Sequence, residues 1–318
     1  MNFFTNFFVA AVLAGTPLLF GILGEIINEK SGHLNLGVEG MMSIGACAGF
    51  MMGYKTDNLL LALIAAFAAG MLGALIYAVL TVTFMADQNV TGLTLTIFGI
   101  GLSNFFGDFF REKSGETSLK LPAGILNSLG KVEIPVLSDI PVLGKLFFNY
   151  NIFVYLGIVA AILCGIYLHR TKAGLNIRAV GENPAAADAA GLPVTRLKYL
   201  NLMLGGGICG LGGAYCSMII CNGVWISNCV NGLGWIAVAL VIFATWNPNK
   251  AVFAALVFGA FSVLKYYVPK SVIRIPDSIF DMVPFFMTIL VLIVTSIRSS
   301  KENSQPQSCG VNYFREER

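Results

Sequence analysis

The residues best able to bind a small molecule are polar side chains set into strongly apolar sequence. They gather around residues 25–39 and 87–108, with one tryptophan further on. Amides and hydroxyls suit hydrogen bonding to an uncharged polar molecule, and an aromatic ring offers a face for stacking. The candidates for contact with such a molecule are Glu25, Asn28, Asn35, Glu39, Gln88, Asn89, Thr91, Asn104 and Trp235.

Residue patterns that would support catalysis are missing from the sequence. It contains no G-x-x-x-x-G-K-[ST] loop for ATP, no H-E-x-x-H and no G-x-S-x-G, and His33 and His169 lie far apart. We therefore expect no catalytic residues, no metal site and no cofactor bound by this chain. Any ATP and Mg would have to be used by another polypeptide.

The elements that carry these residues are predicted to be membrane-spanning helices. Of the 318 residues, 56% are hydrophobic and only 12% are charged, about half the charged fraction of a soluble domain. Leu59 to Met85 alone would form a helix about 40 Å long, enough to cross a hydrocarbon core of about 30 Å. Charges are absent from Met1 to Gly24, Leu59 to Met85, Val90 to Gly107, Leu146 to Leu168, Tyr199 to Asn249 and Met282 to Ile297.

These gaps predict an all-α polytopic bundle of about nine spans, within a range of 8 to 10. The polar stretch from Glu25 to Glu39 has two interpretations. It is either an ordinary loop or a broken helix whose freed backbone groups and amides line a cavity, because irregular backbone at membrane depth must face protein or water.

Charge in the loops predicts the orientation. The positive loop at about 169–198 and the tail are assigned to the cytoplasm, with an even number of spans between them. The stretch at about 111–150 then lies outside, as does the N-terminus, unless a half-span near 28–38 places it inside. We expect one transmembrane domain over 1–298 and a cytoplasmic tail over 299–318.

Small residues repeat along two predicted helices. Gly45, Gly49 and Gly53 are four residues apart, and so are Gly206, Gly210 and Ala214. Such stripes allow helices to approach closely in a membrane. Close packing is the plain interpretation, and a transport pathway beside the backbone is the alternative.

A short helix is predicted inside the positive loop. Asn183 is a good N-cap, Pro184 suits the first helical position, and Gly191 with Pro193 ends the run of alanines. From these residues alone the helix could be a plain linker or an element that seats in a partner's groove.

Four stretches together resemble the permeases of ribose-type and branched-chain-type ABC importers, and within them the nucleoside branch. They are GEIINEKSGHLNLGVEGMMSIGA (24–46), DQNVTGLTLTIFGIGLS (87–103), IRAVGENPAAADAAGLPVTRLKYLNLMLGGGICGLGGAY (177–215) and GWIAVALVIFATWNP (234–248). The resemblance covers about residues 15 to 265. Asn231-Gly232-Leu233-Gly234-Trp235 departs from the G-R-G-[FY] run usual in the family.

The resemblance implies an importer permease fold in a bacterial cytoplasmic membrane. It implies as partners ABC ATPase subunits, a second permease and an extracellular solute-binding lipoprotein, with no nucleic acid. The residues that it assigns to ATPase coupling are Gly181, Glu182, Asn183, Pro184, Ala187, Ala190 and Gly191.

The substrate that the resemblance favours is a nucleoside, and a simple sugar is the alternative. A secondary transporter would need ionisable residues within the spans, and a membrane enzyme would need a catalytic cluster. The uncharged segments and the missing motifs argue against both classes.

Overall fold

The computed structural model describes residues 2–133, 143–267 and 304–314, with isolated residues between 279 and 293. The span predicted at about 280–297 lies largely outside these described residues. Parts of the predicted outer segment and of the tail also lie outside them.

The described chain is a helical bundle, as predicted. Six of its helices are long and apolar enough to cross a membrane. They are α1 (Asn2–Lys30), α3 (Leu59–Ala78) with a π-helical extension (Val79–Thr83), α4 (Gln88–Ser114), α7 (Ile152–Arg170), α10 (Val194–Tyr215) with a π-helical extension (Cys216–Ile220), and α12 (Pro248–Tyr267). Two further helices of the bundle are α2 (Val38–Thr56), which is less apolar than these six, and the short apolar helix α11 (Leu233–Phe243).

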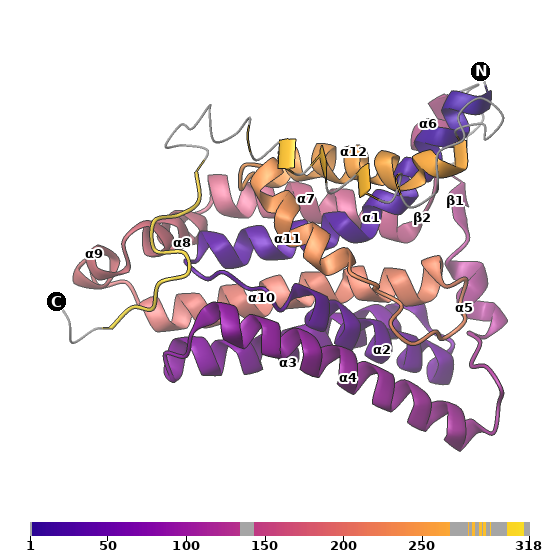
Figure 1. Ribbon diagram of the computed structural model, residues 1–318, viewed down its shortest axis with the longest axis horizontal. Coiled ribbons are helices and arrows are strands. Elements are labelled where there is room, and N and C mark those ends of the chain that lie inside the picture. Colours follow the sequence, from indigo (N-terminus) through magenta and orange to yellow (C-terminus); the bar gives the residue numbers. More distant parts are fainter. Residues whose placement is uncertain are drawn as a thin grey trace.

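Helix α1 runs through the middle of the bundle, with α7 and α12 on one side and α10 on the other (Figure 1). Beyond α10 lie α2, α3 and α4. The α1 side chains Phe20, Ile22 and Ile26 are completely buried. The middle position of α1 explains why its C-terminal half, which carries the polar residues, is buried.

Polar segments occupy opposite ends of the bundle (Figure 1). One end carries α8 (Lys172–Glu182) and α9 (Pro184–Ala189). The other carries α5 (Ala123–Ser128), α6 (Leu143–Phe147) and the N-terminus, with the antiparallel strands β1 (Lys131–Glu133) and β2 (Asn149–Asn151), in which Val132 faces Tyr150.

The two predicted stripes of small residues pack against each other. A Cβ atom added to Gly45 on α2 would lie 2.4 Å from the Cα atom of Gly210 on α10, and one on Gly49 would lie 3.2 Å from Ala214 Cβ. The same stripe of α10 also meets α3, because a Cβ on Gly70 of α3 would lie 2.2 Å from the Gly206 carbonyl oxygen and 3.0 Å from the Gly210 Cα atom. These glycines therefore allow backbone contact among α2, α3 and α10.

Gly45→Ala should destabilise the bundle, because the added methyl group meets backbone and cannot be accommodated by a side-chain rotation. We expect a cost of about 1–3 kcal/mol, as for other overpacked sites, measured as a lower thermal unfolding midpoint in detergent. Gly101→Ala on α4 is the matched control, since nothing lies within 4 Å of its added Cβ. Equal stability of the two variants would contradict the close packing of α2 on α10.

Candidate functional site

The polar stretch at residues 25–39 is a helix break. Helix α1 ends at Lys30, α2 begins at Val38, and residues 31–37 are not helical. Gly32 has φ +88°, a conformation that favours glycine. Both interpretations of this stretch, an ordinary loop and a broken helix, predict such a non-helical segment, so the choice between them and the lining of a cavity stay predictions.

Side chains from three helices bind backbone groups of this break that have no partner within a helix. The Asn35 N–H donates to Glu25 Oε1 at 2.8 Å, and the Leu34 N–H donates to Gln88 Oε1 at 2.9 Å. The Tyr77 hydroxyl donates to the Leu34 carbonyl at 2.7 Å. Each bond replaces one that an uninterrupted helix would have made, so the break is stable although it is buried.

Glu39 performs a related role at the start of α11. Its two carboxylate oxygens accept hydrogen bonds from the Gly232 N–H at 2.7 Å and the Gly234 N–H at 2.6 Å. A negative charge at a helix N-terminus is favourable, because unpaired N–H groups gather there. The neighbouring Trp235 is 38% exposed and available to contact another molecule.

The predicted small-molecule contacts thus fall into separate groups. Glu25, Asn28, Asn35 and Gln88 lie together at the helix break, where the Asn28 amide donates to Glu25 Oε2 at 2.9 Å. Glu39 and Trp235 lie at the start of α11.

The remaining candidates lie along α4. Thr91 is buried and donates to the Asp87 carbonyl, while Asn89 is exposed. Further along, the Asn104 amide donates to Asn228 Oδ1 at 2.8 Å and accepts from the Asn228 N–H at 3.1 Å. The structure does not bring all nine residues into one site, and their contact with a solute stays a prediction.

Glu29 and Trp246 are polar partners that the sequence patterns did not identify as a pair. The Trp246 indole N–H donates to Glu29 Oε2 at 2.6 Å. Tyr77 was also missed, although a tyrosine hydroxyl inside an apolar helix is a signal that a buried partner exists.

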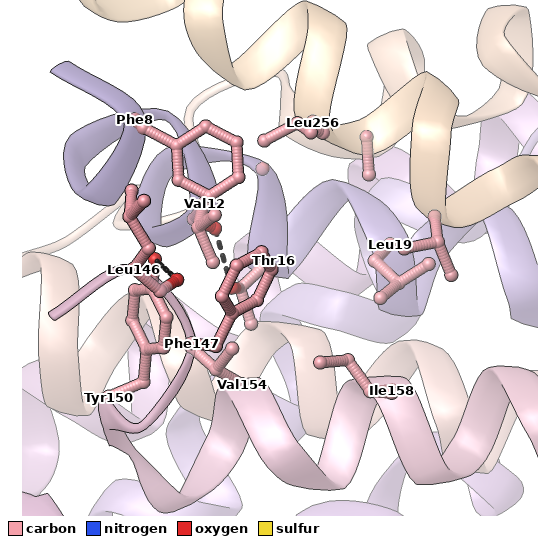
Figure 2. Close-up of a pocket in the computed structure, with 13 residues that line it drawn as sticks. Phe8, Val12, Thr16, Leu19, Leu146, Phe147, Tyr150, Val154, Ile158 and Leu256 are labelled. Atoms are coloured by element: carbon pink, nitrogen blue, oxygen red, sulfur yellow. Dashed lines mark hydrogen bonds between the residues drawn. The ribbon is translucent and has the colours of Figure 1, made fainter. Parts of the chain in front are cut away.

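An apolar pocket of about 200 Å³ lies among α1, α6, α7 and α12 (Figure 2). Phe8, Leu19 and Val154 are among its walls, and its few hydroxyl groups are already engaged. Thr16 donates to the Val12 carbonyl, and Tyr150 donates to the Leu146 carbonyl. The pocket therefore does not provide the free polar groups that a polar solute needs.

The predicted short helix in the positive loop is confirmed as α9. Asn183 Oδ1 accepts a hydrogen bond from the Ala186 N–H at 2.9 Å, and Pro184 occupies the start of the helix. Gly191 follows the helix with φ +83°. The cap and the stop signal lie where the sequence placed them.

Helix α9 has one inner and one outer face. Ala187 is 4% exposed and packs with Val180 and Val194, so it lies on the inner face. The exposed positions on and beside α9 include Glu182, Asn183, Ala185, Ala186, Ala189 and Ala190. The outer face is small and smooth, which suits a helix that seats in a groove.

Gly181 connects this region to the helix break. A Cβ atom at Gly181 would lie 2.3 Å from the Lys30 carbonyl oxygen and 3.4 Å from the Gly32 nitrogen. The C-terminal end of α8 therefore packs directly on the backbone at the end of α1. A displacement of α8 would move this backbone as well.

Comparison with known proteins gives this arrangement a family. Residues 7–292 match the model of the branched-chain amino acid transport system permease component. The chain belongs to this family. The permease is therefore a multi-pass membrane subunit of an ABC importer for a small solute, and it is not itself catalytic.

Three similar relatives come from different organisms. The "Nucleoside ABC transporter permease protein NupC" of Lactococcus lactis is 33% identical over 96% of this permease and 95% of the relative. The "Guanosine ABC transporter permease protein NupQ" of Bacillus subtilis is 34% identical over 97% and 96%. The "Putative glucose ABC transporter permease protein TsgC13" of Haloferax volcanii is 36% identical over 83% and 78%.

Each of these three organisms also has a second, more distant relative, and these are 23%, 24% and 24% identical to the permease. Among solved structures, "An inward-facing conformation of a putative metal-chelate type ABC transporter" aligns over 92% of this permease and 85% of that chain. Its TM-score is 0.45 and its identity is 13%.

Tyr77→Phe should destabilise the permease, because it leaves the Leu34 carbonyl without its donor inside the bundle. We expect a loss of about 1–3 kcal/mol, the usual cost of an unpaired buried group, read as a lower unfolding midpoint. Tyr54→Phe removes a hydroxyl that bonds Glu116 at the exposed surface and should change stability by less than about 0.5 kcal/mol. A Tyr77→Phe variant as stable as Tyr54→Phe would contradict the role of Tyr77 at the break.

Proposed function

We propose that the permease imports nucleosides by ATP-driven alternating access. The observation that carries this proposal is the similarity to the Lactococcus nucleoside and Bacillus guanosine permeases, each along nearly the whole length of both chains. Similarity that includes every span is more informative about the solute pathway than similarity confined to one segment.

A simple sugar is the second candidate, because the Haloferax glucose relative has slightly higher identity, 36%. Its alignment covers a smaller share of both chains. The resemblance of residues 24–46 to the nucleoside branch also favours the nucleoside.

The chemistry around the spans supports a neutral polar substrate. A nucleoside combines a flat base with hydroxyl and amide-like groups, so it needs aromatic faces and neutral hydrogen-bonding side chains. The half-exposed Trp235 supplies an aromatic face. The Asn104–Asn228 pair supplies neutral amides, and a solute would have to share or replace the bonds that its two oxygens accept within the pair. The buried carboxylate of Glu39 is already bonded to backbone N–H groups, which supports a structural role for it.

The proposed transporter contains several subunits. ATP and Mg are used by a separate pair of ATPase subunits, and an extracellular lipoprotein receptor delivers the solute. A second, dissimilar permease completes the pathway, and its support is that all three organisms above have a second, more distant permease relative. With α8 and α9 in the cytoplasm, the N-terminal end of α1 lies outside.

Helix α9 is proposed to dock into the ATPase subunit. Its support is the exposed alanine face, the Asn183 cap, and the packing of Gly181 on Lys30. The outer face would contact the ATPase, and the inner face at Ala187 would hold α9 against the bundle. A displacement of α9 by the ATPase would then be transmitted to the break between α1 and α2.

Nucleoside specificity is tested with the extracellular lipoprotein receptor of the proposed transporter. Purified receptor should bind guanosine or another nucleoside in calorimetry and should not bind ribose or glucose. Uptake of the same ligand by cells should be inhibited by vanadate and lost when the ATPase gene is deleted. Binding of sugar alone would favour the second candidate, and uptake that survives the deletion but needs a proton gradient would exclude an ABC importer.

Ala186→Glu should abolish uptake while the protein still inserts, because it places a bulky charge on the outer face of α9. We expect a reduction of at least about tenfold, the effect of roughly 1.4 kcal/mol of lost docking free energy. Ala123→Glu is the matched control, since Ala123 is also an exposed alanine in a short helix but lies at the opposite end of the bundle. Normal uptake by the Ala186→Glu variant would rule out docking through this face.

A further inference from the structure

The C-terminal segment 304–314 lies along α8 and α9 (yellow in Figure 1). It forms neither helix nor strand, yet its side chains bind atoms of several separate elements. Ser308 is buried, and its backbone N–H donates to the Gly181 carbonyl at 3.0 Å. Its hydroxyl also bonds to the Gly181 carbonyl and to the Val180 carbonyl. The segment is therefore anchored at the junction between α8 and the end of α1.

Asn312 connects the segment to the turn before α4. Its amide donates to the carbonyls of Met85 at 2.7 Å and Ala86 at 3.1 Å. Its Oδ1 accepts from the Gln88 amide at 3.2 Å, and Gln88 in turn accepts from the Leu34 N–H. Asn312 is thus one residue removed from the helix break.

Tyr313 connects the segment to α9. Its hydroxyl donates to Asp188 Oδ2 at 2.9 Å. Its side chain also packs against the cluster in which Ala187, on the inner face of α9, meets Val180 of α8 and Val194 of α10. The described part of the segment therefore supports α9 from inside and leaves the exposed alanines of the outer face available.

The segment also reaches Glu29, the partner of Trp246. The Gln305 amide lies 3.5 Å and the Cys309 thiol 3.9 Å from Glu29 Oε2. Burial raises the pKa of the Cys309 thiol, so it stays protonated at neutral pH and can donate to the carboxylate.

The contacts of Asn312 and Tyr313 are coupled because these two residues are neighbours in the chain. Asn312 and Tyr313 are consecutive, so their Cα atoms are about 3.8 Å apart, while their side chains bind two elements that are more than 90 residues apart in sequence, at Met85 and Asp188. A displacement of α9 would pull on Tyr313 and, through Asn312, on the turn and the helix break.

We propose that residues 304–314 form a strap that transmits movement of α9 to the 85–88 turn and the 31–37 break, with Asn312 and Tyr313 as its positioning residues. The proposal rests on the proposed docking of α9 into the ATPase. Asn312 and Tyr313 contact neither solute nor ATP in this scheme, and they act through the elements that they join.

The test is the ratio of solute imported to ATP hydrolysed by the complete transporter in proteoliposomes. The variant Asn312→Ala/Tyr313→Phe should copurify with the ATPase and hydrolyse ATP, while import per ATP falls about fivefold, as expected for the loss of hydrogen bonds of ordinary net strength. Val311→Ala is the control, because Val311 directly precedes Asn312 but its side chain is 60% exposed. The single variants Asn312→Ala and Tyr313→Phe are used if the double variant does not fold.

An unchanged ratio in these variants would overturn the strap. So would loss of ATPase association together with lower thermal stability, since the segment would then only support the fold. The proposed function is judged separately by Ala186→Glu. If the Ala186→Glu variant still transports, docking through α9 is wrong. If Ala186→Glu abolishes uptake but the Asn312 and Tyr313 variants keep the normal ratio of solute imported to ATP hydrolysed, only the strap is contradicted.

Discussion

The structure depends on hydrogen bonds to the backbone polar groups at the break between α1 and α2. Most of this segment is buried in the protein, and a buried polar group without a partner costs free energy. Glu25, Gln88 and Tyr77 supply the missing partners from α1, α4 and α3. Since these helices are held through the break, a change there affects several spans together. This location suits a transporter that must rearrange between two states.

Local features of the fold were predictable from sequence because their causes lie close together along the chain. Stretches without charge predicted the spans, and the Asn183 and Pro184 signals predicted α9. The stripes around Gly45 and Gly210 predicted close packing, and the two stripes proved to be each other's partners. The sequence could not pair them, because stripes of small residues carry no information about which helix they contact.

The contacts of the candidate site were less predictable for the same reason. The sequence identified Glu25 and Glu39 as unusual residues in apolar surroundings, but their partners, Asn35 for one and Gly232 with Gly234 for the other, are defined by tertiary structure. The role of the C-terminal segment was hidden too. A short polar tail has no periodic pattern, and the contact between Tyr313 and Asp188 spans 125 residues of sequence.

The alanine face of α9 has a thermodynamic consequence. Alanine has no side-chain rotamers to lose, so a partner that closes around this face orders almost no additional side chains. The Asn183 cap has already fixed the start of the helix before the partner arrives. Contact with another subunit would therefore carry a small entropic cost. Because α9 needs no reordering, this contact could form and break in each transport cycle without a large kinetic barrier.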